Sequence, residues 1–188
     1  MGTPSARPGQ IDALLQRQQR GERIKYLFFW GHQPPRGPGI GPSFLSQWWP
    51  SRFEIDGVVY PTAEHYMMSE KGRLFGDDVS VAKILRAQHP GEAKALGRQV
   101  ARFDERVWAA SRYDIVVRAS IAKFEQNPQL RDFLLGTSNR VLVEASPLDW
   151  VWGIGLTADD ERAQNPAQWQ GLNLLGFALM DARFALGG

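Results

Sequence analysis

Helical spacing of apolar residues runs through the middle of the chain and constrains the fold more than any other feature. It covers residues 62–75, 78–87, 90–98, 104–122 and 128–135. Pro90 and Pro128 stand near helix starts, where a missing N–H costs little. Strands are predicted before and after this helical stretch, at 25–30 and 141–146. A β-hairpin is predicted around the Asp56-Gly57 turn. With a largely apolar closing helix over 172–186, this predicts an α+β fold: a single, mostly helical domain with a small β-sheet.

The two ends of the chain differ in character. Residues 1–23 are predicted to be an N-terminal tail (1–9) and a short polar helix (11–23), and residues 24–188 to be the domain. The loop over 31–42 holds four prolines and four glycines, which excludes regular structure. We expect it to be a shaped surface loop with room for a binding role. No repeat or second domain boundary appears in the 188 residues.

Composition excludes several classes of protein. The chain has no cysteine, so it has neither disulfides nor a thiolate zinc site. No apolar run reaches the roughly 18 residues of a membrane span, and no signal peptide is recognisable, so we expect a cytoplasmic protein. Seventeen arginines against five lysines favour a phosphorylated partner, unless they reflect genome composition. The net charge of +2 does not by itself indicate nucleic-acid binding.

The segment YPTAEHYMMSEKGRLF (60–75) carries the most unusual pattern. Thr62 is a natural N-cap, and helical spacing puts Glu64 and Lys71 on the face that also carries Met67 and Met68. The two ionisable residues are seven positions apart, about 10 Å along a helix axis. They either line a cavity and converge on one ligand, or they are structural: Glu64 at the positive helix end and Lys71 reaching the surface.

Two further patterns allow both a functional and a structural interpretation. Trp150, Trp152 and Trp169 suit either stacking on a flat heterocycle or core packing. Arginines repeat at 98, 102 and 106, with another at 112, as a phosphate-binding stripe or as a solvated face. The match of WGIGLTA (152–158) to a dinucleotide fingerprint is rejected because no amphipathic helix follows it. Its glycines instead indicate a close backbone approach or a sharp turn.

Motifs for several common chemistries are absent. His32, His65 and His89 lack metal-ligand spacing, and the sequence has neither a serine-hydrolase elbow nor a phosphate-binding P-loop. We therefore expect no metal and no cofactor. Residue patterns alone name no substrate.

Segments along nearly the whole chain, from about residue 26 to 184, resemble the YbiA-like or NADAR (NAD- and ADP-ribose-associated) family. They are FFWG (28–31), FLSQWWPSRFEIDGVVYPTAEHYMMSEK (44–71), LGRQV (96–100), LVEASPLDWVWGIGL (142–156) and GLNLLGFALMDAR (171–183). The family often has S-N-F-Y-P where this chain has Ser46-Gln47-Trp48-Trp49-Pro50. This departure bears on which base the chain prefers.

The resemblance implies an N-glycosidase that cleaves ribose 5-phosphate from the amino group of riboflavin-pathway pyrimidines. One alternative is a hydrolase that removes ADP-ribose from guanine in nucleic acid, and another is a non-catalytic nucleotide-binding module. The resemblance assigns chemistry to Glu64, Lys71 and Asp149. Substrate contacts are expected from Trp30, Gly31, Ser46, Trp48, His65, Trp152, Gly153, Gly155 and Asn173. The oligomeric state is not predicted.

Two mechanisms fit these assignments. In the first, a desolvated Lys71 with a lowered pKa attacks C1 of the sugar and forms a Schiff base, while Glu64 acts as general acid and base. In the second, Glu64 or Asp149 activates water against an oxocarbenium-like sugar and Lys71 only grips the substrate.

Overall fold

The computed structural model describes residues 9–32 and 41–188. Most of the predicted tail (1–8) and the centre of the Gly/Pro loop (33–40) lie outside the described residues. The described elements follow in the order α1 (Gly9–Gln19), β1 (Tyr26–Phe29), η1 (Pro42–Leu45), β2 (Phe53–Ile55), β3 (Val58–Tyr60), α2 (Ala63–Leu74), α3 (Asp78–Arg86), α4 (Pro90–Gly97), α5 (Glu105–Glu125), α6 (Pro128–Gly136), β4 (Val141–Glu144), η2 (Glu161–Gln164), η3 (Pro166–Gln168) and α7 (Leu174–Ala185).

The strands form two separate pairs. β1 and β4 pair in parallel, with Tyr26 opposite Val141 and Phe29 opposite Glu144. β2 and β3 form the expected antiparallel hairpin. Its turn residues Asp56 and Gly57 both have positive φ angles (52° and 77°), the conformation that makes Asp-Gly a preferred hairpin turn. The predicted mostly helical α+β domain is confirmed, with two small sheets in place of one.

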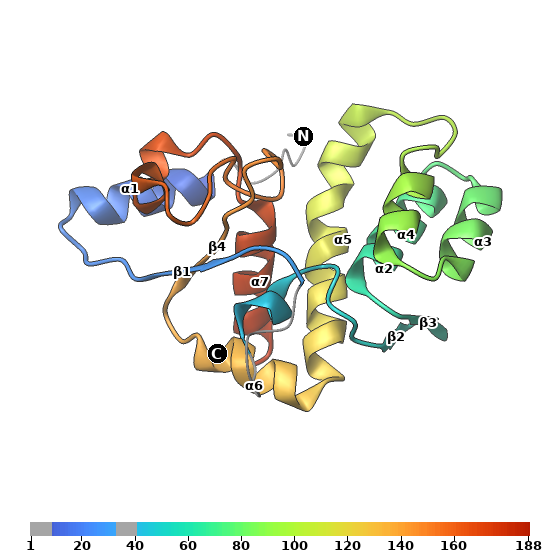
Figure 1. The fold of residues 1–188 in the computed structure, drawn as a ribbon, viewed down its shortest axis with the longest axis horizontal. Coiled ribbons are helices and arrows are strands. Elements are labelled where there is room, and N and C mark those ends of the chain that lie inside the picture. The colour runs from blue at the N-terminus through green and yellow to red at the C-terminus, as the bar shows by residue number, and fades with distance from the viewer. Residues whose placement is uncertain (1–8, 33–40) are drawn as a thin grey trace, which may run out of the picture.

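The helix α5 divides the molecule (Figure 1). α2, α3 and α4 lie on one side of it, and α7 with the β1–β4 pair lies on the other. α2 contacts α3, α4 and α5, so it is buried almost all round from Ala63 to Ser69. A charged residue in this part of α2 is therefore forced away from water unless a cavity reaches it.

Two helix starts are fixed by local hydrogen bonds. Thr62 caps α2 as predicted, and its side-chain oxygen accepts from the backbone N–H of His65. Asn173 precedes α7 in a left-handed conformation (φ 53°). Its side-chain Nδ2 donates to Leu142 O (2.9 Å), and its Oδ1 accepts from Glu144 N (3.0 Å). The start of α7 is therefore bonded to the edge of β4 that does not pair with β1.

The N-terminal helix lies against the domain. α1 begins at Gly9 and ends at Gln19, earlier at both ends than the predicted 11–23. Leu14 is buried in the main core, and Gln10 donates to the hydroxyl of Tyr113 on α5 (2.9 Å). Within residues 9–32 and 41–188, none of the helices has the length and apolar character needed to cross a membrane.

Candidate active site

A cavity of about 490 Å³ lies beside α5, between the α2–α4 side of the molecule and the β4–α7 side. This volume is in the range of small-molecule sites. One wall comes from α2 and α4, a second from α5, and a third from the end of β4 with the loop after it. The lining residues are Ser46, Gln47, Trp48, Glu64, Met67, Met68, Lys71, Lys94, Arg98, Phe103, Glu105, Trp108, Arg112, Glu144, Leu148, Asp149, Trp150, Val151, Trp152 and Leu175.

Glu64 enters this cavity from the first turn of α2. Its side chain is only 3% exposed, and its Oε1 has no hydrogen-bond partner among the described residues. Burial raises the pKa of Glu64 to about 7, against the opposing effects of the Lys94 charge and a hydrogen bond from the Trp48 side chain. At neutral pH this carboxyl is therefore able both to give and to take a proton.

A second carboxyl, Glu144, was missed by sequence reasoning. It ends the buried strand β4, lines the same cavity, and its Oε2 is also without a partner in the described part of the chain. Burial, followed by the charge of Asp149, raises the pKa of Glu144 to about 8, and the charge of Glu64 adds to this. The only available clue was a carboxylate that interrupts the apolar run of Val141–Val143.

Lys71 lies in the cavity wall two turns after Glu64. Its Nζ is 4.1 Å from the centroid of the Phe103 ring and 5.7 Å from that of Trp108. Burial lowers the pKa of Lys71, the charge of Glu105 opposes this, and that of Arg98 adds to it. The desolvating neighbours of Lys71 thus include two aromatic rings from outside α2. No ion pair joins Lys71 to Glu64 among the described residues.

The predicted arginine stripe is divided between two surroundings. Arg98 and Arg112 line the cavity, whereas Arg102 donates to Gly76 O and Arg106 is exposed. Arg112 is buried, and its Nη1 bonds to Glu105 Oε1 (3.2 Å). Its Nε has no partner in the described residues. The cavity therefore contains a fixed guanidinium with a free donor, which suits a phosphate oxygen.

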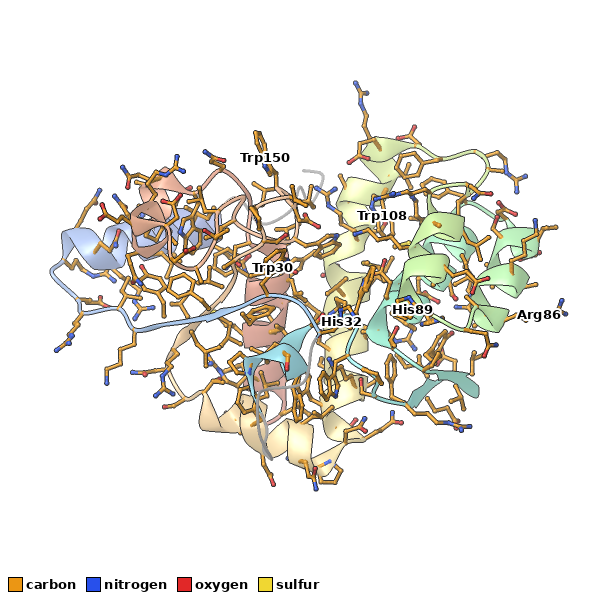
Figure 2. All side chains as sticks on the ribbon, viewed as in Figure 1. Trp30, His32, Arg86, His89, Trp108 and Trp150 are labelled. Carbon is orange, nitrogen blue, oxygen red and sulfur yellow. The ribbon has the colours of Figure 1, made fainter. Side chains whose placement is uncertain are left out.

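Aromatic side chains provide flat walls. The cavity is lined by Trp48, Trp108, Trp150 and Trp152, of which Trp108 comes from α5 and Trp150 from the loop after β4; both are labelled in Figure 2. Trp169, for which stacking and core packing were both open, packs against Tyr26 and donates its indole N–H to Ala163 O. Of the three tryptophans considered, Trp150 and Trp152 line the cavity and Trp169 does not.

Asp149 lies at the cavity and holds the loop that follows β4. Its Oδ1 accepts from the backbone N–H groups of Val151 (2.9 Å) and Trp152 (2.7 Å). The glycine after these residues is required by packing: a Cβ on Gly153 would lie 2.8 Å from Glu144 O. Gly155 has φ 70°. Gly153 lets the loop pack against the end of β4, whereas Gly155 packs against Trp150 and Gln170, and neither glycine is in the cavity lining.

Four more predicted contact residues lie outside the cavity lining. His65 is fully buried: its Nε2 faces Ala87 O (3.2 Å) and must donate, so its Nδ1 accepts from the Thr62 hydroxyl (2.7 Å). Asn173 is fully buried beside β4, as described above. Trp30 is largely exposed at the end of β1 (Figure 2), and Gly31 follows it with φ 74°. Ser46, Trp48 and Trp152, by contrast, join Glu64 and Lys71.

The arrangement defines a class of site. Within the described ranges, no group of three or more His, Cys, Asp or Glu side chains is placed to hold a metal ion. The cavity instead combines two carboxyls with raised pKa values, an amine with a lowered pKa, free guanidinium donors and aromatic faces. Such a set fits acid–base and nucleophilic chemistry on a phosphorylated ligand that carries a flat ring.

Comparisons with known proteins give the family. The NADAR domain model matches residues 28–187, and the chain belongs to the NADAR family. It is 41% identical to an N-glycosidase of Acanthamoeba polyphaga mimivirus over 86% of this chain and 96% of that protein. It is 33% identical to N-glycosidase YbiA of Escherichia coli over 72% and 74%. Both of these relatives are N-glycosidases, as the resemblance implied.

Two other comparisons extend this result. The solved NMR structure of Escherichia coli YbiA matches with a TM-score of 0.70 at 25% identity, over 99% of this chain and 93% of that one. The chloroplastic riboflavin biosynthesis protein PYRR of Zea mays is 36% identical over 68% of this chain but only 20% of its own length. The fold expected from the resemblance is therefore confirmed by a solved relative.

Proposed function

We propose that the protein is an N-glycosidase that hydrolyses the bond between ribose 5-phosphate and the amino group of a riboflavin-pathway pyrimidine. The observation that carries the proposal is the set of buried ionisable atoms without partners in one cavity: Glu64 Oε1, Glu144 Oε2 and Arg112 Nε. Buried charged groups are normally paired, so these await a ligand. The N-glycosidase relatives support the reaction class, and the maize relative's name supports the pathway.

The polarity of the cavity sets the orientation of the substrate. Arg112 is paired with Glu105, whose charge acts on Lys71, so we place the phosphorylated sugar at this end. Arg98 lines the same cavity, and its charge acts on both Lys71 and Glu64. The carboxyls of Glu64 and Glu144 lie toward the departing nitrogen. Trp48 and Trp152 offer faces to the ring. C1 of the sugar then lies between the amine of Lys71 and the acid of Glu64.

The reaction proceeds through a Schiff base. The ribosylamine opens to an imine at C1, and neutral Lys71 adds to that carbon. Protonated Glu64 gives its proton to the exocyclic amino nitrogen of the pyrimidine, the bond between C1 and this nitrogen breaks to release the aminopyrimidine, and C1 remains double-bonded to Nζ of Lys71. The Glu64 carboxylate then takes a proton from water, whose oxygen adds to C1. Collapse of this adduct releases ribose 5-phosphate and restores Lys71, for a net consumption of one water.

Direct attack by water is the rival mechanism. Here Glu64 activates the water, and Lys71 contributes only its charge. Asp149 is less suited to this role than Glu144 because one of its oxygens already accepts two backbone hydrogen bonds. Borohydride added during turnover separates the mechanisms. A reduced sugar adduct on Lys71 supports the Schiff base, and turnover without an adduct favours direct attack.

Release of ribose 5-phosphate tests the proposed function. The protein is incubated with a ribosylamino-pyrimidine 5′-phosphate, and the products are read by mass spectrometry. We expect free ribose 5-phosphate and the aminopyrimidine, and no release from the Lys71→Met variant. Tight binding of this substrate without turnover would contradict the proposal and indicate a nucleotide-binding module.

The rim of the cavity favours one second candidate, removal of ADP-ribose from guanine in nucleic acid. Trp150 is 61% exposed and Leu148 is 89% exposed, and both border the cavity. The exposed ring of Trp150 is suited to stacking with a neighbouring base of a single strand, and Leu148 adds an apolar contact beside it. An ADP-ribosylated guanine oligonucleotide, assayed in parallel, decides: release of ADP-ribose with no release of ribose 5-phosphate selects this candidate.

A further inference from the structure

The side-chain amide of Gln47 is the least explained polar group in the cavity wall. The residue is 7% exposed, it lines the cavity, and both its Nε2 and its Oε1 are buried without a partner among the described residues. The mechanism above gives this amide no task. A hydrocarbon side chain of similar size would fill the same space without burying two unpaired polar atoms.

Another buried amide in the molecule shows the usual arrangement. Asn173 uses both ends of its amide, Nδ2 on Leu142 O and Oδ1 on Glu144 N. Buried side-chain amides normally find such partners in the protein or in bound molecules. Because Gln47 borders the cavity, the missing partner is best supplied by the ligand.

The chain fixes the position of Gln47 from two directions. Lys123 is 1% exposed, and its Nζ donates to Phe44 O and to Ser46 O, each at 2.8 Å. These carbonyls belong to the turn that immediately precedes Gln47. On the other side, the backbone O of Gln47 accepts from Glu64 N (3.1 Å). Hydrogen bonds therefore fix the backbone that bears the Gln47 amide, next to the first turn of α2.

This location selects one end of the ligand. Gln47 is bonded through its backbone to Glu64, whereas Lys71 lies seven residues further along α2, about 10 Å away along its axis. In the orientation proposed above, the ring lies at the Glu64 end and the phosphate lies near Arg112. The free amide therefore faces the heterocycle.

We propose that Gln47 is a specificity residue that recognises the leaving heterocycle. Its carboxamide presents one donor beside one acceptor, so it pairs with a ring edge that carries an N–H next to a C=O, as pyrimidinones do. This inference rests on the proposed function, because it takes the orientation of the substrate from it. It adds a requirement that the reaction itself does not impose: the ring of the substrate must carry an N–H next to a C=O.

A binding experiment tests this pairing without turnover. The probes are 6-aminouracil and 6-amino-1,3-dimethyluracil, which keeps the carbonyls and the amine but has lost both ring N–H donors. Calorimetric titration of the wild type is expected to show at least a tenfold preference for 6-aminouracil. In the Gln47→Met variant the preference should fall below about threefold, since methionine fills similar space without hydrogen bonds. Gln99→Met, at an exposed position, is the matched control.

Several outcomes of this titration would contradict the proposed role of Gln47. The inference is overturned if the wild type binds the two probes equally or binds neither, or if Gln47→Met keeps the wild-type preference. It is also overturned if this variant loses affinity for ribose 5-phosphate to the same degree as for 6-aminouracil. If the methionine variant does not fold, Gln47→Leu, which also removes both the donor and the acceptor, provides the same comparison. Failure of the proposed function would appear separately, as absent hydrolysis with the ring preference intact.

Discussion

Two regions of the molecule bury polar side chains in opposite ways. Behind the cavity, around α5, α6 and α7, Lys123, Asn173 and Arg183 are buried with hydrogen-bond partners. In the cavity wall, Glu64 and Glu144 are among the residues that keep atoms without partners. Partners within the chain offset part of the desolvation cost of Lys123, Asn173 and Arg183, whereas Glu64 Oε1 and Glu144 Oε2 have no such partner among the described residues. For these five residues, the difference separates groups that hold the fold from groups that line the cavity.

The largest expected effect comes from removing one of the groups that line the cavity. Glu64→Gln keeps the shape of the side chain but cannot transfer protons, so we expect kcat to fall about 10³-fold. Thermal stability should not fall, because the carboxyl has a free oxygen and an unfavourable environment. Steady-state kinetics and calorimetry on the same preparation check both parts. Loss of stability in parallel with activity would place Glu64 in the first region and break the comparison.

The same variant should alter how stability depends on pH. The pKa of Glu64 is about 7 in the folded protein, against an ordinary value of 4.5. Between these pH values the folded protein retains a proton that the unfolded chain releases. The stability present below pH 4.5 is therefore lost as pH rises through 7, by about 3 kcal/mol. Urea unfolding of Glu64→Gln across this range should lack that loss, and an unchanged slope would contradict the assignment.

Replacing a paired group should have the reverse effect. Lys123→Met leaves Phe44 O and Ser46 O without a donor, and we expect it to reduce the free energy of unfolding by about 2–4 kcal/mol. Burial lowers the pKa of Lys123 to about 7 from its ordinary 10.5, so its neutral form is stabilising as pH rises from 7 toward 10.5. The cost of the variant should accordingly be greater at pH 9 than at pH 6. Equal costs at the two pH values, measured by denaturant unfolding, would contradict this.

Replacing Asn173 should have a smaller effect on the free energy of unfolding, which two variants can separate into hydrogen-bond loss and backbone strain. Asn173→Ala loses two hydrogen bonds and places alanine at φ 53°, which should reduce stability by about 2–3 kcal/mol. Asn173→Gly loses the same hydrogen bonds but tolerates the left-handed conformation, so it should be about 1 kcal/mol less damaging. Thermal denaturation of both variants measures the difference. If alanine and glycine cost the same, backbone strain contributes nothing at this position.

The smallest expected effect concerns the balance of charge in the cavity. The charge of Lys94 lowers the pKa of both Glu64 and Glu144. Lys94→Met should therefore raise both, shifting the pH profile of kcat/KM to higher pH by less than about one unit. Lys83→Met, at an exposed site on α3, is the control and should leave the profile in place. A shift to lower pH would show that Lys94 acts on another group.

The sequence predicted local features of the fold better than it predicted the full set of cavity residues. Thr62 as an N-cap and the Asp56-Gly57 turn are local features, and both appear as expected. Glu64 and Lys71 stood out because their helix face was otherwise apolar. Glu144 could not be found this way, because its burial follows from the pairing of β4 with β1, more than a hundred residues apart in sequence. The absence of partners for Gln47 likewise depends on how the cavity closes.

A contact with a residue remote in sequence also explains why His65, which was expected to contact the substrate, lies outside the cavity lining. His65 lies next to Glu64, and its family motif suggested the substrate. Its ring instead joins Thr62 to Ala87 across two helices, a pairing visible only in three dimensions. Neighbours on a buried helix point in different directions, and only one of these two reaches the cavity.

The fastening of Asn173 to the end of β4 has a consequence for the newly made chain. Nearly all the residues that line the cavity are synthesised before Asn173 emerges, yet Glu144 is framed only when that amide bonds to its backbone N–H. Leu175, which follows on α7, then closes part of the wall. We therefore expect a polypeptide that ends before α7 to possess the reactive groups without the contacts that hold Glu144 and close this part of the wall.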